Sequence, residues 1–166
     1  MPNERNHSPH PTHYYGPFNR ALYNLLNGGL ITKFENHVVS LSDEGTIGPQ
    51  IRALGVPVTT LGMRGGRPSL SGLRKLRRVV REFQPDLIQG SMYHGNLAAA
   101  LARTMATRRP ILAWNIHCSL YDLNYEKPMT RQVIRASRFF SFAPDTILYV
   151  SQLSRKLHET FGFISL

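Results

Sequence analysis

Hydrophobic residues recur along the chain at two alternating spacings, one typical of helices and the other of short strands. Helical spacing begins at Phe18, with a stop expected at Gly28–Gly29, and returns over residues 47–54, 69–83, 96–105, 129–140 and 152–161. Runs of β-branched and other apolar residues between these segments predict strands over 37–41, 56–61, 87–90, 111–116 and 146–150. Because strands alternate with helices, we expect βαβ units and an α/β fold, a parallel sheet covered by helices on both faces.

The first seventeen residues differ from this pattern. They are mostly polar and carry four prolines and three histidines, a composition that cannot bury apolar surface, so residues 1–17 are expected to be a flexible tail. Residues 18–166 are expected to form one domain, without internal repeats. No apolar run approaches the roughly 20 residues of a membrane span, and no secretory signal opens the chain. We therefore expect a cytoplasmic protein, with the inner face of the membrane as a possible contact.

The net charge and the cysteine content limit which partners and which kinds of site we expect. The formal net charge of +10 favours acidic partners, namely phosphorylated sugars or nucleotides, anionic lipids or nucleic acid. The run Arg74–Arg81 predicts a basic amphipathic helix. Its charged face is either simply exposed to solvent or in contact with a membrane surface. No nucleic-acid-binding motif accompanies the charge. Cys118 is the sole cysteine, which excludes an intrachain disulfide and a cysteine-based zinc site. Nothing in the sequence requires a metal or another cofactor.

Candidate site residues follow two of the predicted strands, where ligands of parallel sheets bind. His94 and Asn96 lie where the chain leaves the strand at 87–90, and His117 directly follows the strand at 111–116. An imidazole can accept a proton from a sugar hydroxyl near neutral pH, which makes His117 a candidate base or positioning group. The structural alternatives are that Asn96 caps its helix, that His94 packs against Tyr93, and that His117 bonds only to backbone.

Several stretches, taken in order, resemble the N-terminal domain of glycosyltransferase family 4, whose members are retaining enzymes with two facing Rossmann-like domains. These stretches are residues 37–45, 54–58, 85–88, 93–97, 116–117, 149–151 and 161–163. The resemblance implies that this domain forms the acceptor side, with His117 as a catalytic residue beside the reacting sugar and with His94 and Asn96 binding the acceptor. A C-terminal domain of such enzymes binds the donor, a nucleoside diphosphate sugar, and the acceptor is a hydroxyl of a saccharide or lipid-linked saccharide.

The sequence departs from the family pattern at both ends. The opening strand of the family is not recognisable at Pro9–His13, and Gly16 is the best match to the glycine loop that approaches the donor phosphate. The residues of the C-terminal donor-binding domain do not follow Phe163, so we expect the chain to be inactive alone. Two alternatives remain: a truncated, non-catalytic remnant, and a basic binding module for anionic lipid or nucleic acid.

Overall fold

The computed structural model describes residues 16–63 and 68–164, which divide between two compact units. Unit 1 contains residues 16–38 and 44–58 of the described chain, and unit 2 contains residues 39–43 and 59–164. The chain passes between the units at two short strands, β1 (Val38–Ser40) and β2 (Val58–Thr60), which pair with each other. Residues 1–15 of the predicted tail and residues 64–67 lie outside the described residues.

Unit 1 is built around its helices. They are α1 (Gly16–Leu25), a π-helical turn η1 (Leu26–Leu30), α2 (Ile31–Lys33) and α3 (Gly48–Ala53). The prediction that the first helix stops at Gly28–Gly29 is confirmed, because Gly29 adopts a φ of 110°, outside the helical region, and a second short helix then runs to Lys33. Leu26 and Ile51 lie at the centre of the apolar core of this unit.

Unit 2 contains a three-stranded parallel sheet, with β4 (Ile111–Ile116) between β3 (Leu87–Ser91) and β5 (Thr146–Tyr149). The Asp145 carboxylate ties the start of this sheet together, because it accepts the Leu112 backbone N–H at 2.8 Å. Strands β1 and β2 form a separate sheet, so the described residues contain two parallel-stranded sheets where the hydrophobic pattern alone predicts one. The predicted α/β class is confirmed.

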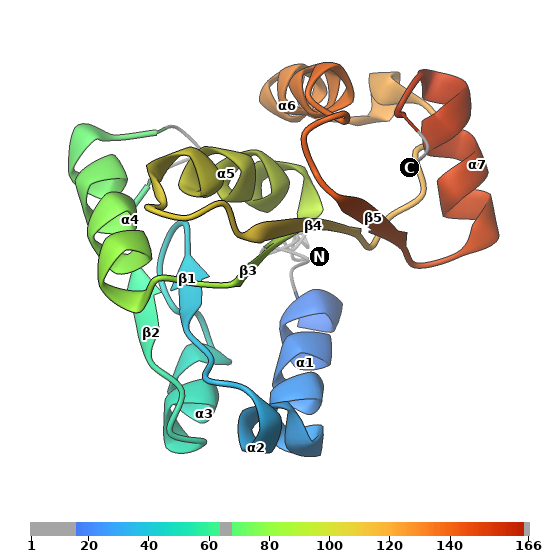
Figure 1. The fold of residues 1–166 in the computed structure, drawn as a ribbon. Coiled ribbons are helices and arrows are strands. Elements are labelled where there is room, and N and C mark those ends of the chain that lie inside the picture. The colour runs from blue at the N-terminus through green and yellow to red at the C-terminus, as the bar shows by residue number, and fades with distance from the viewer. Residues whose placement is uncertain (1–15, 64–67, 165–166) are drawn as a thin grey trace, which may run out of the picture. The chain divides into compact units, whose positions relative to one another are not determined.

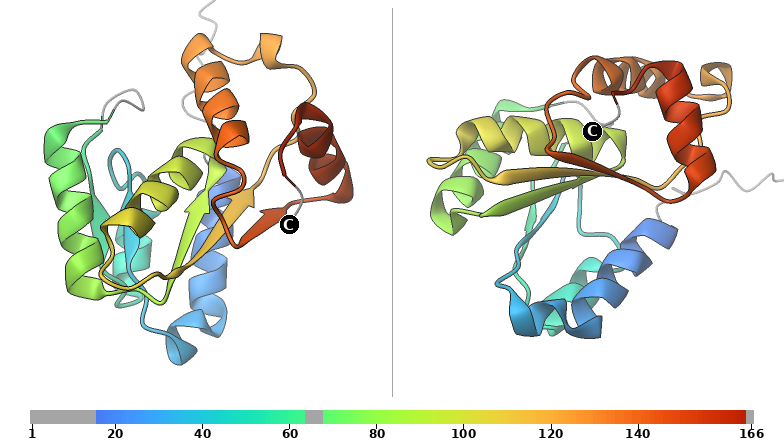
Figure 2. Two further views of the ribbon diagram at one scale, coloured as in Figure 1. Left: turned by 45° about the horizontal axis from the view of Figure 1, so that its top comes forward. Right: turned by 45° about the vertical axis from the view of Figure 1, so that its right-hand side comes forward.

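The helices of unit 2 alternate with its strands, as the sequence predicts. They are α4 (Leu70–Phe83), α5 (Met92–Met105), α6 (Pro128–Phe139), α7 (Gln152–Phe161) and a short 3-10 helix, η2 (Leu123–Tyr125). Helices α5, α6 and α7 lie on the same side of the three strands (Figures 1 and 2). Trp114 and Ile116 of β4 and Ile134 of α6 are fully buried and form the centre of the core.

Helix α4 confirms the basic amphipathic pattern of the sequence. Its cations are exposed, whereas Leu76 and Val80 are buried against the ends of β1 and β2 and against α5. The Ser69 hydroxyl caps the helix by accepting the Gly72 N–H at 3.1 Å, as expected for a serine just before an apolar-periodic segment. Leu70, in contrast, is exposed, so the apolar stripe is shorter at its N-terminal end than predicted.

Candidate functional site

The carboxyl ends of β3 and β4 lie side by side in unit 2. Their register pairs Ser91 with Asn115, the last but one residue of β4. His94 follows Ser91 within the first turn of α5, and His117 follows directly after β4. The structure thus places both histidines at neighbouring strand ends, where ligands of parallel α/β folds bind.

The chain turns from β3 into α5 more sharply than the sequence predicts. The predicted helix begins at Asn96, but α5 begins at Met92, so His94 and Asn96 lie on the helix and not in a loop. Met92 has a φ of 59°, a left-handed conformation that costs a residue with a side chain roughly 1–2 kcal/mol. This strained turn lets the strand enter the helix without an intervening loop.

Gly90 allows α5 to approach the end of β3 closely. A Cβ atom at Gly90 would lie 2.6 Å from the Asn96 Cα and 2.8 Å from the Gly95 carbonyl oxygen, far inside normal contact distances. Because both of these atoms belong to the helix backbone, no side-chain rotation could relieve the clash. Glycine is therefore required here by close backbone approach.

Asn96 is fully buried and connects α5 to β4. Its Oδ1 accepts the Asn115 backbone N–H at 3.3 Å, and its Nδ2 has no hydrogen-bond partner among the described residues. It does not cap α5, whose N-cap is Ser91. The contact with Asn115 couples the position of α5 to the strand that leads to His117.

Burial affects His94 and His117 in the same direction. Both side chains are half-buried, and burial lowers the pKa of each imidazole from the ordinary value of 6.5. A lowered pKa keeps the ring neutral at pH 7, so each histidine is able to accept a proton or a hydroxyl hydrogen bond.

Next to His117, four residues form a polar ring that the sequence does not reveal, here called the buried polar ring: Tyr93, Ser154 and His158, which are buried, and Cys118, which is half-buried. The Cys118 thiol donates to Tyr93 Oη at 3.3 Å, and Tyr93 Oη lies 2.8 Å from His158 Nε2. His158 Nδ1 lies 2.7 Å from the Ser154 carbonyl oxygen, and the Ser154 hydroxyl donates to the Cys118 carbonyl oxygen at 2.6 Å. The ring joins α5, the segment after β4, and α7.

Hydrogen-bond geometry determines the protonation of this buried polar ring. Because the Ser154 carbonyl only accepts, His158 Nδ1 carries the proton, and the bare Nε2 accepts the Tyr93 hydroxyl. Burial lowers the pKa of His158, partly offset by the bond to Ser154, and burial raises the pKa values of Tyr93 and Cys118. All four groups are therefore neutral at pH 7.

The other features considered in the sequence add no residue to this site at the ends of β3 and β4. Gly16 is the first residue of α1 in unit 1, so its predicted role at the donor phosphate stays a prediction. The described residues hold no cluster of three or more His, Cys, Asp or Glu side chains arranged to bind a metal ion. None of the helices in the described part of the chain is both long and apolar enough to cross a membrane.

Comparison with known proteins identifies a family. Residues 10–164 match the sequence model of a family described as glycosyl transferase 4-like domain. No curated protein and no solved structure gives a significant match. Because the matched segment covers nearly the whole chain, the chain belongs to the glycosyl transferase 4-like domain family, which confirms the resemblance seen in the sequence.

Proposed function

We propose that this member of the glycosyl transferase 4-like family forms the acceptor side of a sugar-transfer site. The donor in this proposal is a nucleoside diphosphate sugar, and the acceptor is a hydroxyl of a saccharide or lipid-linked saccharide. A donor-binding domain, in the same polypeptide or in another one, completes the cleft, and the anomeric configuration is retained. Without that domain we expect no transfer.

The observation that carries this proposal is the placement of His94 and His117 at the neighbouring ends of β3 and β4. In the transfer step the acceptor oxygen bonds to the anomeric carbon, and the bond from that carbon to the diphosphate breaks. The acceptor must also lose its proton. A neutral imidazole at His117 can accept this proton or orient the hydroxyl that loses it.

His94, Asn96 and Gly16 have supporting roles in the proposal. His94 contacts the acceptor from the first turn of α5, whereas Asn96, being fully buried, acts through the Asn115 backbone that it holds. Gly16 would approach the donor phosphate through its backbone at the start of α1.

The decisive experiment measures transfer by the chain alone and by the chain mixed with a donor-binding domain from the same family. Mass spectrometry detects glycoside products from a panel of nucleoside diphosphate sugars and alkyl glycosides. His117→Ala should abolish the product. His37→Ala is the matched control, because His37 is also half-buried with a pKa lowered by burial but lies in unit 1 before β1.

Two outcomes would contradict the proposal. If no donor and acceptor pair gives product with any donor-binding domain, the remnant or binding-module alternative replaces it. If His117→Ala and His37→Ala lower transfer equally, the acceptor-side assignment of His117 fails even though the family assignment stands.

A further inference from the structure

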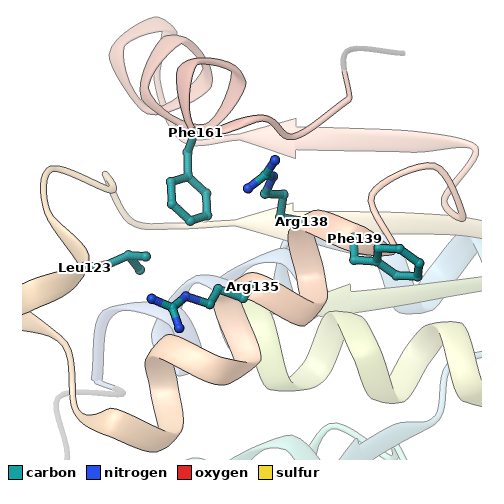
Figure 3. A pocket seen from close by; sticks show the side chains of 5 residues that line it. All are labelled: Leu123, Arg135, Arg138, Phe139 and Phe161. Carbon is teal, nitrogen blue, oxygen red and sulfur yellow. The ribbon is translucent and has the colours of Figure 1, made fainter.

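Helix α6 borders a hollow that the transfer site does not use. The hollow has a volume of about 570 Å³ and is lined by Leu123, Arg135, Arg138, Phe139 and Phe161, which belong to η2, α6 and α7 (Figure 3). All of these elements belong to unit 2. This volume falls within the usual range of small-molecule sites, roughly 300–1,000 Å³.

The lining of this hollow combines apolar and cationic groups. Phe161 points into it from α7, and Leu123 and Arg135 approach from the opposite side (Figure 3). The Arg138 guanidinium lies 5.6 Å from the centre of the Phe161 ring, so it is held by a cation–π contact. None of the lining residues is acidic. The site therefore suits a ligand with an apolar part and a negative charge.

A second hollow of about 280 Å³ continues along the same helix and is lined by Pro128, Arg131, Gln132 and Arg135. Arg135 lines both hollows, so one ligand can occupy the polar and the apolar part together. Arg131 and Arg135 are four residues apart and thus lie on the same side of α6. The Arg131 Nε is buried and, among the described residues, has no hydrogen-bond partner.

The cations of α6 also lack carboxylate partners in the described part of the chain. The ion pairs found there involve Arg52, Arg103, Arg109 and Arg155, and α6 itself contains no acidic residue. Two neighbouring guanidinium groups can together hold one phosphate through several charge-assisted hydrogen bonds. We call the pair Arg131 and Arg135 the arginine pair.

A cluster of exposed phenylalanines lies at the C-terminal end of α6, and one of them, Phe139, lines the larger hollow. Phe139, Phe140 and Phe142 are 71%, 44% and 58% exposed, and their rings contact one another in sequence, at centroid distances of 5.1 and 6.3 Å. Aromatic rings next to cations on one exposed helix end are typical of segments that insert at a lipid headgroup boundary. Helix α4 has more cations, five against three in α6, but among the described residues it carries no comparable aromatic cluster.

We propose that α6 binds an anionic phospholipid at a membrane surface. The arginine pair holds the lipid phosphate, the hollow beside Phe161 and Leu123 receives the first methylene groups of an acyl chain, and the exposed phenylalanines enter the headgroup boundary. This proposal does not depend on sugar transfer, so either can fail without the other.

Vesicle co-sedimentation of the full chain tests the proposal. The probes are vesicles of phosphatidylcholine alone and of phosphatidylcholine mixed in equal parts with phosphatidylglycerol. We expect binding only to the mixed vesicles, and the double variant Arg131→Gln/Arg135→Gln should weaken it about tenfold or more. The control, Arg74→Gln/Arg78→Gln, removes the same charge from α4 and should weaken binding much less.

A second variant and two competitors separate the lipid from other anions. Phe139→Ser/Phe142→Ser keeps the charge and removes only exposed side chains, and it too should weaken vesicle binding. Equal losses in the α6 and α4 charge variants would overturn the proposal in favour of general electrostatic attraction. Full displacement from vesicles by inorganic phosphate, or by a single-stranded oligonucleotide whose binding needs the arginine pair, would overturn it in favour of a free phosphate or a nucleic acid.

Discussion

Tyr93 Oη and His158 Nε2 lie 2.8 Å apart in the interior of unit 2, although 65 residues separate them in the sequence. This contact closes the buried polar ring, which ties α7 to α5 and to the segment directly after His117. Removing one member leaves each of its neighbours in the ring with a polar atom that has lost its partner. The ring is therefore a source of stability and of order at the candidate site.

Tyr93→Phe should destabilise the fold by about 1–3 kcal/mol, because it leaves His158 Nε2 without its donor and the Cys118 thiol without its acceptor. Urea denaturation followed by circular dichroism measures this loss. Tyr121→Phe makes the same chemical change on a side chain that is 73% exposed, and its unfolding free energy should not change measurably. Equal effects of the two substitutions would contradict a structural role for the ring.

The stability of the fold should fall in mild acid. The pKa of His158 lies below 6.5 when folded, so between that pKa and 6.5 the unfolded chain binds more protons. The contribution of His158 is thus fully present above pH 6.5 and is lost as the pH falls toward the folded pKa. One proton corresponds to at most about 1.4 kcal/mol per pH unit.

His158→Gln tests this assignment, because the amide can accept from Tyr93 but does not titrate. Denaturation at pH 7.5, 6.5 and 5.5, three values chosen to bracket the ordinary histidine pKa of about 6.5, should show a smaller decline for the variant than for the native chain. His37, His94 and His117 also have lowered pKa values, so part of the decline should persist. If the variant loses stability in acid as steeply as the native chain does, the acid sensitivity comes from His37, His94 and His117 instead.

Two glycines of the same segment should respond oppositely to alanine. Gly90→Ala places a Cβ 2.6 Å from the Asn96 Cα and should destabilise the fold by about 1–3 kcal/mol. Gly95→Ala meets no atom within 4 Å and lies inside α5, so it should stabilise the fold by up to about 1 kcal/mol. Thermal denaturation of both variants distinguishes these directions, and a loss for Gly95→Ala would show that the space beside α5 is occupied.

The proposed base has a kinetic signature. Replacing His117 by Gln should lower the kcat of transfer about 100-fold or more if the imidazole takes the acceptor proton. For the native chain assayed together with a donor-binding domain, kcat/KM should fall in acid with an apparent pKa below 6.5, and the variant should not show this fall. If kcat/KM of the variant still falls in acid, another group accepts the proton and His117 only orients the acceptor.

Hydrophobic periodicity in the sequence predicts much of this fold, because it reflects which side of each helix or strand is buried. The strand at Ile111–Ile116 and the helix at Gln152–Phe161 have the predicted bounds. The early start of α5 is different, since Met92 adopts a left-handed φ that no propensity favours. The tight approach at Gly90, which a local pattern does not encode, makes this turn possible.

The candidate site is predictable only in part for a related reason. The positions of His94 and His117 follow from the rule that parallel strands end at one edge of a sheet. The partnership of Tyr93 with His158 depends on how α7 packs on α5, and a single sequence carries no signal for such a pair. The one available hint is that His158 and Ser154 recur at helical spacing on the buried side of α7.

Because the groups of the buried polar ring are uncharged, the ring should respond to salt differently from the arginines of α6. Bonds between uncharged, buried groups are not screened by dissolved ions, so the geometry beside His117 should persist in concentrated salt. Phosphate contacts of the α6 arginines would weaken steeply under the same conditions. Raising the salt concentration should therefore release the chain from vesicles while the fold around the ring stays intact. Lipid binding and the site at the ends of β3 and β4 could then be studied separately on one protein sample.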